Sequence, residues 1–209
     1  MKPGSFVTFE GIEGAGKSSN ISYAEMLLKN SGKPVMLTRE PGGTPLGESL
    51  RELLLGHQHD GMSFKAELLL MFAARAQHLQ SKILPALERG EWVICDRFTD
   101  ATYAYQGGGR NLDSAVISVL ETLVQGERRP DLTILLDLPV EMGLERAGQR
   151  SAPDRFEKEK LDFFERVRAA YLQIAGKDPQ RVKVVDASLP LEQVQQQIKV
   201  VLAPFLESA

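Results

Sequence analysis

The chain has 209 residues, of which 43% are apolar and 25% are charged, and its formal net charge is -3. This length suits one domain with a sizeable core, and the negative charge argues against a general nucleic-acid binder because nucleic-acid phosphates would be repelled overall. The sequence contains no run of about 18 apolar residues, the length needed to span a membrane. Its N-terminal residues lack the apolar segment of a signal peptide. The single cysteine, Cys95, fits a reducing compartment, so we expect a cytoplasmic protein with no membrane or nucleic-acid partner.

Short apolar runs of strand length alternate along the chain with longer segments of helical periodicity. The expected strands are Phe6–Phe9, Val35–Thr38, Trp92–Cys95, Leu132–Leu136 and Val182–Val185. The expected helices are about Ser18–Leu28, Leu46–Leu55, Phe64–Leu87, Ser114–Val124, Val140–Ala147, Lys158–Ala175 and Leu191–Leu202. Nearly all-apolar strands between helices indicate an α/β fold, a five-stranded parallel sheet with helices on both faces.

Two segments fit neither pattern. Gly107–Asn111 is expected to be a glycine loop, and the charged segment 148–159 contains Arg150, Asp154 and Arg155. Charged excursions on α/β enzymes are often lids, although on the residues alone a plain surface loop is an equally good interpretation. We expect a single domain over residues 1–209, with a small lid at about 148–159.

The segment Gly11–Ser18 (GIEGAGKS) satisfies the pattern G-x-x-x-x-G-K-[ST] between an expected strand and an expected helix. Glycines let backbone N–H groups converge on phosphates, and the helix N-terminus adds a favourable partial charge. Lys17 can neutralise phosphate charge, and Ser18 supplies a hydroxyl for Mg²⁺. The sequence therefore predicts an ATP site with Mg²⁺ on this P-loop, formed by Gly11, Ile12, Glu13, Gly14, Ala15, Gly16, Lys17 and Ser18.

Three carboxylates lie near the expected phosphate site. Glu13 would stand beside bound phosphates, either facing solvent or meeting an acceptor hydroxyl or a basic lid residue. Asp96 ends an apolar strand, where ligands bind in doubly wound sheets, so it can hold Mg²⁺ directly or through water while Arg97 binds an acceptor phosphate. Asp137 also ends a strand, but no base follows it, and we assign it a structural role.

Two other kinds of site are disfavoured by what the sequence lacks. None of the three asparagines is followed by lysine, so the guanine motif Asn-Lys-x-Asp of GTPase switches is missing. The histidines have no Cys or His partners at zinc-site spacing, and we expect all three, His57, His59 and His78, to be surface residues.

Taken in chain order, these motifs resemble the thymidylate kinase family of P-loop NTPases, specifically its bacterial members. Phe9–Ser18 resembles the family's P-loop with its internal acid, Thr38–Thr44 (TREPGGT) its second signature, and Asp96–Phe98 its Asp-Arg-aromatic element. Ala104–Gly107 and Arg129–Thr133 also fit. The resemblance covers almost the whole chain. It implies an enzyme that transfers the γ-phosphate of ATP to dTMP, giving dTDP and ADP for dTTP synthesis.

The resemblance also implies a dTMP site. Arg97 would hold the dTMP phosphate with support from two further arginines, because planar guanidinium groups suit phosphate oxygens. Arg75 would donate to a thymine carbonyl, and Thr102 and Gln106 would read the edge of the base. The implied substrate-binding residues are Arg39, Glu40, Pro41, Arg51, Met71, Phe72, Arg75, Arg97, Thr102 and Gln106.

The residue that stacks on thymine is open. The family usually has a Phe four residues before the base-binding Arg, a position that Met71 occupies here, while Phe72 lies three residues before it. Both positions share a helix face with Arg75, so either side chain could face the base, and both could equally pack in the core.

The catalytic arginine is expected in the lid. Thymidylate kinases place one either in the P-loop or in the lid, and the variable P-loop positions of this chain hold no base. The resemblance favours Arg150 and Arg146 for closing over ATP and stabilising the transferring phosphoryl group, with Arg155 as a lid anchor or phosphate contact. The implied catalytic residues are Lys17, Glu13, Arg97, Arg150 and Arg146.

The resemblance further implies a homodimer, for which the apolar face of Phe64–Leu87 could serve as interface, and an adenine site near Asp186–Ser188 formed by backbone atoms. Two rival functions stay open on sequence grounds, a kinase for another nucleotide or nucleoside and a non-catalytic ATP-binding protein. The second rival leaves Asp96, Arg97 and the lid arginines without a role.

Overall fold

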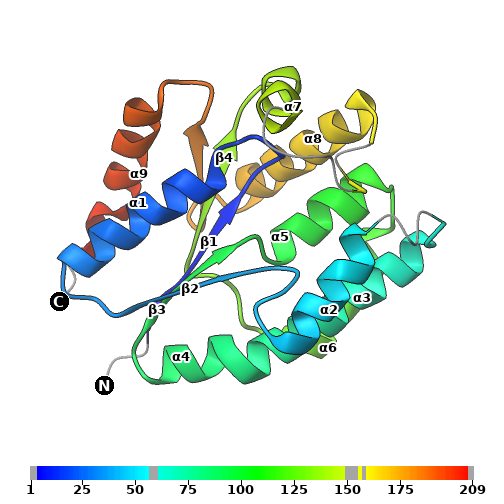
Figure 1. The fold of residues 1–209 in the computed structure, drawn as a ribbon, viewed down its shortest axis with the longest axis horizontal. Helices are drawn as coiled ribbons and strands as arrows, with labels where there is room; N and C mark the ends of the chain where they lie inside the picture. The colour runs from blue at the N-terminus through cyan, green and yellow to red at the C-terminus, as the bar shows by residue number, and fades with distance from the viewer. Residues whose placement is uncertain (1–3, 57–60, 149–154, 157–158, 207–209) are drawn as a thin grey trace.

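A five-stranded parallel sheet forms the centre of the computed structural model, which describes residues 4–56, 61–148, 155–156 and 159–206 (Figure 1). The strand order is β2-β3-β1-β4-β5, and every neighbouring pair is parallel. This confirms the predicted sheet. The strands are β1 (Phe6–Glu10), β2 (Val35–Arg39), β3 (Trp92–Asp96), β4 (Leu132–Asp137) and β5 (Val182–Asp186).

Each strand runs one residue further than its apolar pattern predicted, and each ends on a charged residue. The extra residues continue the hydrogen-bonded ladder, as in the pairings of Arg39 with Asp96 and of Asp137 with Asp186. The C-terminal edge of the sheet therefore gathers five ionisable side chains. In parallel sheets this edge is where ligands bind.

Helices cover both faces of the sheet, as predicted (Figure 1). Alternate residues of the central strands point to opposite faces, so Val7 and Phe9 pack with the residues of α1, whereas Phe6 and Val93 pack with those of η2 and α4. The helices are α1 (Lys17–Asn30), α2 (Pro45–Leu55), α3 (Phe64–His78), η2 (Leu79–Ile83), α4 (Leu84–Glu88), α5 (Thr99–Thr102), η3 (Tyr103–Gly109), α6 (Ser114–Gln125), α7 (Val140–Gly148), α8 (Leu161–Lys177) and α9 (Leu191–Leu206). No described helix is long and apolar enough to cross a membrane.

The predicted glycine loop is wrong in part, because Gly107–Gly109 complete the π-helix η3. These glycines allow close packing rather than a turn. A Cβ on Gly108 would lie 2.7 Å from the Cβ of Ala170, and one on Gly109 would lie 2.4 Å from the ring of Phe163. Both contacts are with α8, so the glycines let η3 approach that helix.

A second close approach joins the P-loop to α7. Gly14 has a φ of +72°, and a Cβ built on it would lie 1.9 Å from the carbonyl oxygen of Gly143. In turn, a Cβ on Gly143 would lie 2.7 Å from the carbonyl oxygen of Glu13. The loop can therefore rest on α7 only while both positions lack a side chain.

We expect Gly14→Ala to destabilise the protein more than Gly32→Ala. Gly32 has a similar φ of +75° but has nothing within 4 Å of its would-be Cβ. Both variants carry a left-handed backbone cost of about 1 kcal/mol, and Gly14→Ala adds an overpacking cost of about 1–3 kcal/mol. Equilibrium unfolding in urea measures both losses. Equal losses would contradict the contact between the P-loop and α7.

Candidate active site

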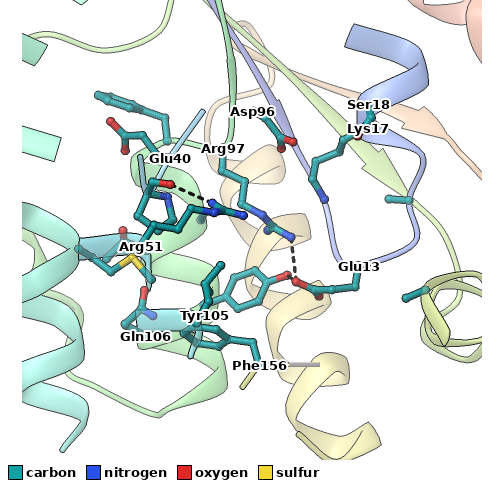
Figure 2. Close-up of a pocket in the computed structure, with 18 of the residues that line it drawn as sticks. Glu13, Lys17, Ser18, Glu40, Arg51, Asp96, Arg97, Tyr105, Gln106 and Phe156 are labelled. Carbon is teal, nitrogen blue, oxygen red and sulfur yellow. Dashed lines mark hydrogen bonds and ion pairs between the residues drawn. The ribbon is translucent and has the colours of Figure 1, made fainter. Parts of the chain in front are cut away.

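A cavity of about 260 Å³ opens at the C-terminal edge of the sheet, beside the P-loop (Figure 2). Its walls come from the P-loop, the segment after β2, α2, α3, the end of β3 and the residues after it, the end of α5, η3 and α7. The predicted site residues that line it are Glu13, Gly14, Ala15, Gly16, Lys17, Ser18, Glu40, Pro41, Arg51, Met71, Arg75, Asp96, Arg97, Thr102 and Gln106. The predicted residues Gly11, Ile12, Arg39, Phe72 and Arg146 are not among its lining, and Arg150 lies outside the described residues.

The P-loop presents positive charge to this cavity. The Nζ atom of Lys17 donates to the carbonyl oxygens of Gly11 and Ile12, at 3.2 and 3.1 Å, so these two residues orient the lysine through their backbone. Because the N-cap of α1 is Gly16, no side-chain oxygen caps the first turn of the helix. Burial, together with the charge of Arg97, lowers the pKa of Lys17 to about 8. Such a shift marks a cation whose charge an incoming anion would stabilise.

Glu13 contacts Arg97 and Tyr105, rather than facing only solvent or meeting a described arginine of the predicted lid. One of its oxygens lies 2.9 Å from Nη2 of Arg97, and the hydroxyl of Tyr105 donates to both oxygens at 2.8 and 2.7 Å (Figure 2). The guanidinium of Arg97 also lies over the ring of Tyr105, 4.7 Å from its centroid. Glu13 therefore connects the P-loop to Arg97, a contact that neither interpretation of the sequence included.

Asp96 and Ser18 offer oxygen atoms suited to Mg²⁺. Both residues line the cavity, and Oδ1 of Asp96 is buried without a hydrogen-bond partner. A buried carboxylate oxygen with no partner is costly unless a ligand completes it, and Mg²⁺ prefers hard oxygen ligands. Among the described residues, no cluster of three or more His, Cys, Asp or Glu could hold a metal alone. The residues therefore fit a Mg²⁺ ion that keeps water and phosphate ligands.

Arg75 is buried, and most of its donors are engaged. Its Nε donates to Glu40 at 2.8 Å, and its Nη2 donates to the carbonyl oxygen of Phe98 at 3.2 Å and to the hydroxyl of Thr102 at 3.0 Å. Its Nη1 is buried without a partner. Because the side chain lines the cavity, this N–H group is available to a carbonyl oxygen of a ligand.

Met71, and not Phe72, lies in the cavity wall. Phe72 is buried in a separate core cluster with Leu68 and Ile117. Its ring lies beneath Arg75, 4.8 Å from the guanidinium carbon. Of the two alternatives for Phe72, the structure therefore shows core packing. Successive residues of a helix are rotated by about 100°, so Phe72 is turned away from the cavity that Met71 lines.

The prediction that His78 lies at the surface is wrong. His78 is fully buried, with Nδ1 3.0 Å from Glu40 and Nε2 2.6 Å from the hydroxyl of Thr38. Its position three residues after Arg75 puts both side chains on one face of α3, where the same carboxylate meets both. The other two histidines, His57 and His59, lie outside the described residues.

The two supporting arginines are placed differently. Arg51 lines the cavity and donates to the carbonyl oxygen of Pro41 at 2.9 Å, while burial and the charge of Arg39 lower the pKa of its guanidinium. Arg39 is exposed and pairs with Glu48 at 2.9 Å. The structure thus brings only Arg51 to the cavity.

Arg155, in the segment predicted to be a lid, is buried against α2 and α3. Its Nη2 lies 2.7 Å from the fully buried carboxylate of Glu67, and its Nε donates to the carbonyl oxygen of Leu54 at 2.8 Å. Glu67 also accepts from Gln106 at 2.8 Å and pairs with Arg110. These contacts match the anchoring alternative for Arg155 and occupy one of the two N–H groups of the Gln106 amide.

Arg146 does not line the cavity. Its Nη1 donates to the carbonyl oxygen of Ala187, at 2.9 Å, in the segment that follows β5 and was predicted to hold adenine. Asp137 likewise lies apart and forms a two-pronged pair with Arg168, at 2.7 and 2.9 Å, which fits its predicted structural role. The base that Asp137 lacks in sequence is supplied by a distant helix.

Several lining residues were not predicted. They are Leu55, Phe98, Ala101, Tyr105, Ala147 and Phe156. Tyr105 had a visible signal, since it precedes Gln106 in the Ala-Tyr-Gln-Gly motif, but its hydroxyl reaches Glu13 across 92 residues of sequence. Phe156 gave no signal, because its place in the wall depends on tertiary contacts that a local pattern does not show.

Comparison with known proteins decides the family. The protein-family model described as thymidylate kinase matches residues 9–198 of this chain. The chain belongs to the thymidylate kinase family. A thymidylate kinase from Alcanivorax borkumensis is 60% identical over 195 residues, covering 93% of this chain and 94% of the relative. One from Pseudomonas entomophila is 59% identical over 204 residues, covering 98% and 97%.

A solved thymidylate kinase shares the fold. The crystal structure of the enzyme from Ehrlichia chaffeensis is similar to this chain with a TM-score of 0.77 at 38% sequence identity, covering 96% of this chain and 99% of that one. The chain is therefore a P-loop enzyme of this family, as the order of its motifs predicted.

Proposed function

We propose that the cavity beside the P-loop is where this thymidylate kinase family member transfers the γ-phosphate of ATP to dTMP, giving dTDP and ADP. The observation that carries the proposal is the meeting, in one cavity, of a P-loop lysine with Arg51, Arg75 and Arg97. Two phosphate groups and a base need such a set of donors. The family match over nearly the full chain supplies the reaction.

The donor side is the P-loop. Lys17 and the uncapped first turn of α1 would bind the ATP phosphates. Ser18 and Asp96 would hold Mg²⁺, which when bound neutralises charge on the phosphate oxygens. Arg146, held on the carbonyl oxygen of Ala187, supports the segment proposed to contact adenine, so of its two predicted roles we retain ATP binding and not catalysis.

The acceptor side begins at Arg97 and Arg51, which would hold the dTMP phosphate. Arg75 would donate from its unpartnered Nη1 to a thymine carbonyl, with Met71 against the base. The acceptor phosphate is already ionised at neutral pH, so no general base is required. Catalysis then consists of alignment and charge stabilisation by Lys17 and the arginines.

We propose a single domain whose lid, at about 148–159, carries the catalytic arginine. Arg150, which lies outside the described residues, retains that role from the sequence. The pairing of Arg155 with Glu67 supports the proposal, because it fixes one point of the lid segment to α3 beside the acceptor cavity.

The function is tested by supplying ATP together with each of a panel of acceptors and measuring the release of ADP. We expect dTMP to be preferred, with dUMP lower by about 10- to 200-fold because one methyl group of packing is lost. CMP should be lower still, since its amino group would place a donor against the free N–H of Arg75. Preference for another acceptor would refute the proposal, and ATP binding without ADP release would favour the non-catalytic rival.

The variants Arg51→Ala and Arg39→Ala should differ in their effect on KM for dTMP. Losing a phosphate contact at Arg51 is expected to raise KM for dTMP by about 10- to 100-fold. Arg39→Ala removes an exposed pair and should change KM by about twofold or less. Steady-state rates at varied dTMP measure both effects, and equal effects would contradict the placement of the two side chains.

We also propose that the chain forms a homodimer through the adjoining faces of α3 and α6. Exposed apolar side chains on these two helices are Phe64, Leu69, Val116, Val119 and Leu123, with Leu123 78% exposed. An apolar surface of this kind marks an interaction site in soluble proteins. The two helices pack against each other, so their apolar side chains can form one continuous surface.

Leu123→Asp is expected to convert the dimer to a monomer, because it places a charge in the proposed apolar interface. Val200→Asp is the control, since Val200 is also exposed, at 64%, but lies on α9 away from that surface. Sedimentation velocity measures the mass of each variant. A Leu123→Asp protein that sediments like the parent chain would refute this interface.

A further inference from the structure

We infer that Glu10 is a positioning residue that holds Arg97 in place for the acceptor phosphate. Glu10 is the last residue of β1, is fully buried and does not line the cavity. No ligand could reach its carboxylate directly. Its effect on the reaction must therefore pass through the residues that it contacts.

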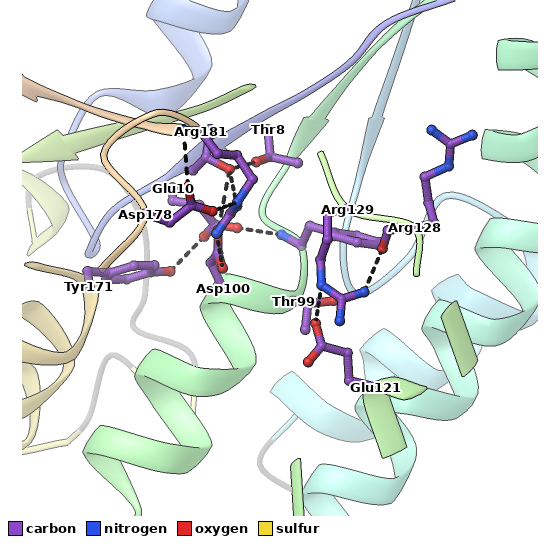
Figure 3. Close-up of polar contacts among 12 residues, drawn as sticks. Thr8, Glu10, Thr99, Asp100, Glu121, Arg128, Arg129, Tyr171, Asp178 and Arg181 are labelled. Carbon is purple, nitrogen blue, oxygen red and sulfur yellow. Dashed lines mark hydrogen bonds and ion pairs between the residues drawn. The ribbon is translucent and has the colours of Figure 1, made fainter. Parts of the chain in front are cut away.

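Both oxygens of Glu10 contact the machinery around Arg97. One oxygen accepts from the backbone N–H of Phe98 at 2.7 Å, and the other accepts from the hydroxyl of Tyr171 at 2.7 Å (Figure 3). The same hydroxyl accepts from Nη1 of Arg97 at 3.2 Å. Glu10 thus acts on Arg97 at two points, on the backbone that follows it and on its guanidinium.

The backbone of Arg97 needs such support. Its φ is 68°, in the left-handed region that costs energy for any residue with a side chain. Two successive N–H groups are held by the end of β1, since Arg97 donates to the carbonyl oxygen of Phe9 at 2.9 Å and Phe98 donates to Glu10. The end of β1 therefore fixes the turn that sends Arg97 into the cavity.

The guanidinium is held from both ends. Nη2 meets Glu13 at 2.9 Å and Nη1 meets Tyr171 at 3.2 Å, so the plane of the group is set by two partners. A guanidinium has five N–H groups, and the remaining ones can point toward an anion. Tyr171, oriented by Glu10, is thus the second of two supports for a phosphate-binding side chain.

The surroundings of Glu10 make a buried carboxyl at this position costly in free energy if its role were only structural. Burial, followed by the nearby charge of Asp100, raises the pKa of its carboxyl to about 8. Asp100 itself is paired with Arg181 (Figure 3). A buried acid at such a position is costly compared with an apolar residue of similar volume. The contacts with Tyr171 and Phe98 give it a task that an apolar residue could not perform.

Binding of dTMP and thymidine to Tyr171→Phe and Glu10→Gln, measured by calorimetry, tests the inference. Thymidine lacks the phosphate that Arg97 is proposed to hold. We expect Tyr171→Phe to weaken dTMP binding about tenfold, the factor of one hydrogen bond to a charged group, and to leave thymidine binding unchanged. Glu10→Gln should act in the same direction.

Tyr103→Phe is the matched control. It also removes a hydroxyl that donates to a carboxylate, at 2.6 Å from Glu121, but that carboxylate belongs to α6, whereas the hydroxyl of Tyr171 contacts Glu10 and Arg97. We expect it to leave the dTMP-to-thymidine ratio unchanged. Equal losses for dTMP and thymidine in Tyr171→Phe, or no loss for either, would overturn the inference. If Glu10→Gln does not fold, the Tyr171→Phe result decides alone.

The inference rests on the proposed phosphate role of Arg97, which a separate arm tests. Arg97→Ala should abolish most of the preference for dTMP over thymidine. If it leaves that preference intact, both the role of Arg97 and the present inference fail. If it abolishes the preference while Tyr171→Phe and Glu10→Gln do not alter it, only the positioning role of Glu10 fails.

Discussion

The ion pair between Glu13 and Arg97 joins the two halves of the candidate active site. Glu13 belongs to the P-loop that follows β1, and Arg97 follows β3, so the pair links the donor side to the acceptor side directly. Phosphoryl transfer requires two phosphates to be aligned within about an ångström of a productive geometry. A carboxylate beside bound phosphates is otherwise costly, and its pairing with Arg97 and Tyr105 explains how the loop tolerates it.

Two further buried carboxylates organise the cavity in a similar way. Glu40 meets both Arg75 and His78, so it orients the group proposed to read the base. Glu67 meets Arg155 and Arg110, and so connects residue 155 and the end of η3, where Arg110 is the C-cap, to α3. Buried pairs of this kind are sensitive to the loss of one partner, since the remaining charge is left unpaired. The binding groups are thus held by acids that do not themselves need to touch a ligand.

The sequence predicted the sheet, its helices and most of the cavity wall, because these depend on local patterns. It stopped each strand one residue short, since a hydropathy pattern cannot show that a charged residue such as Asp96 continues the ladder. The loop predicted at Gly107–Gly109 was wrong, because these residues are helical and Gly108 and Gly109 allow close contact with α8 rather than a turn. The sequence also misplaced His78, because only the fold brings Glu40 to that face of α3.

The sequence by itself determined the P-loop, the acid and arginine that end β3, and the family, because short motifs in a fixed order carry that information. Only the tertiary structure decided which side chains reach the cavity, namely Met71 rather than Phe72 and Arg51 rather than Arg39. It also showed that Glu13 and Glu10 both act on Arg97, one directly and one through Tyr171. These contacts join residues 74 to 161 positions apart. They depend on how the strands pack side by side, which no local pattern specifies.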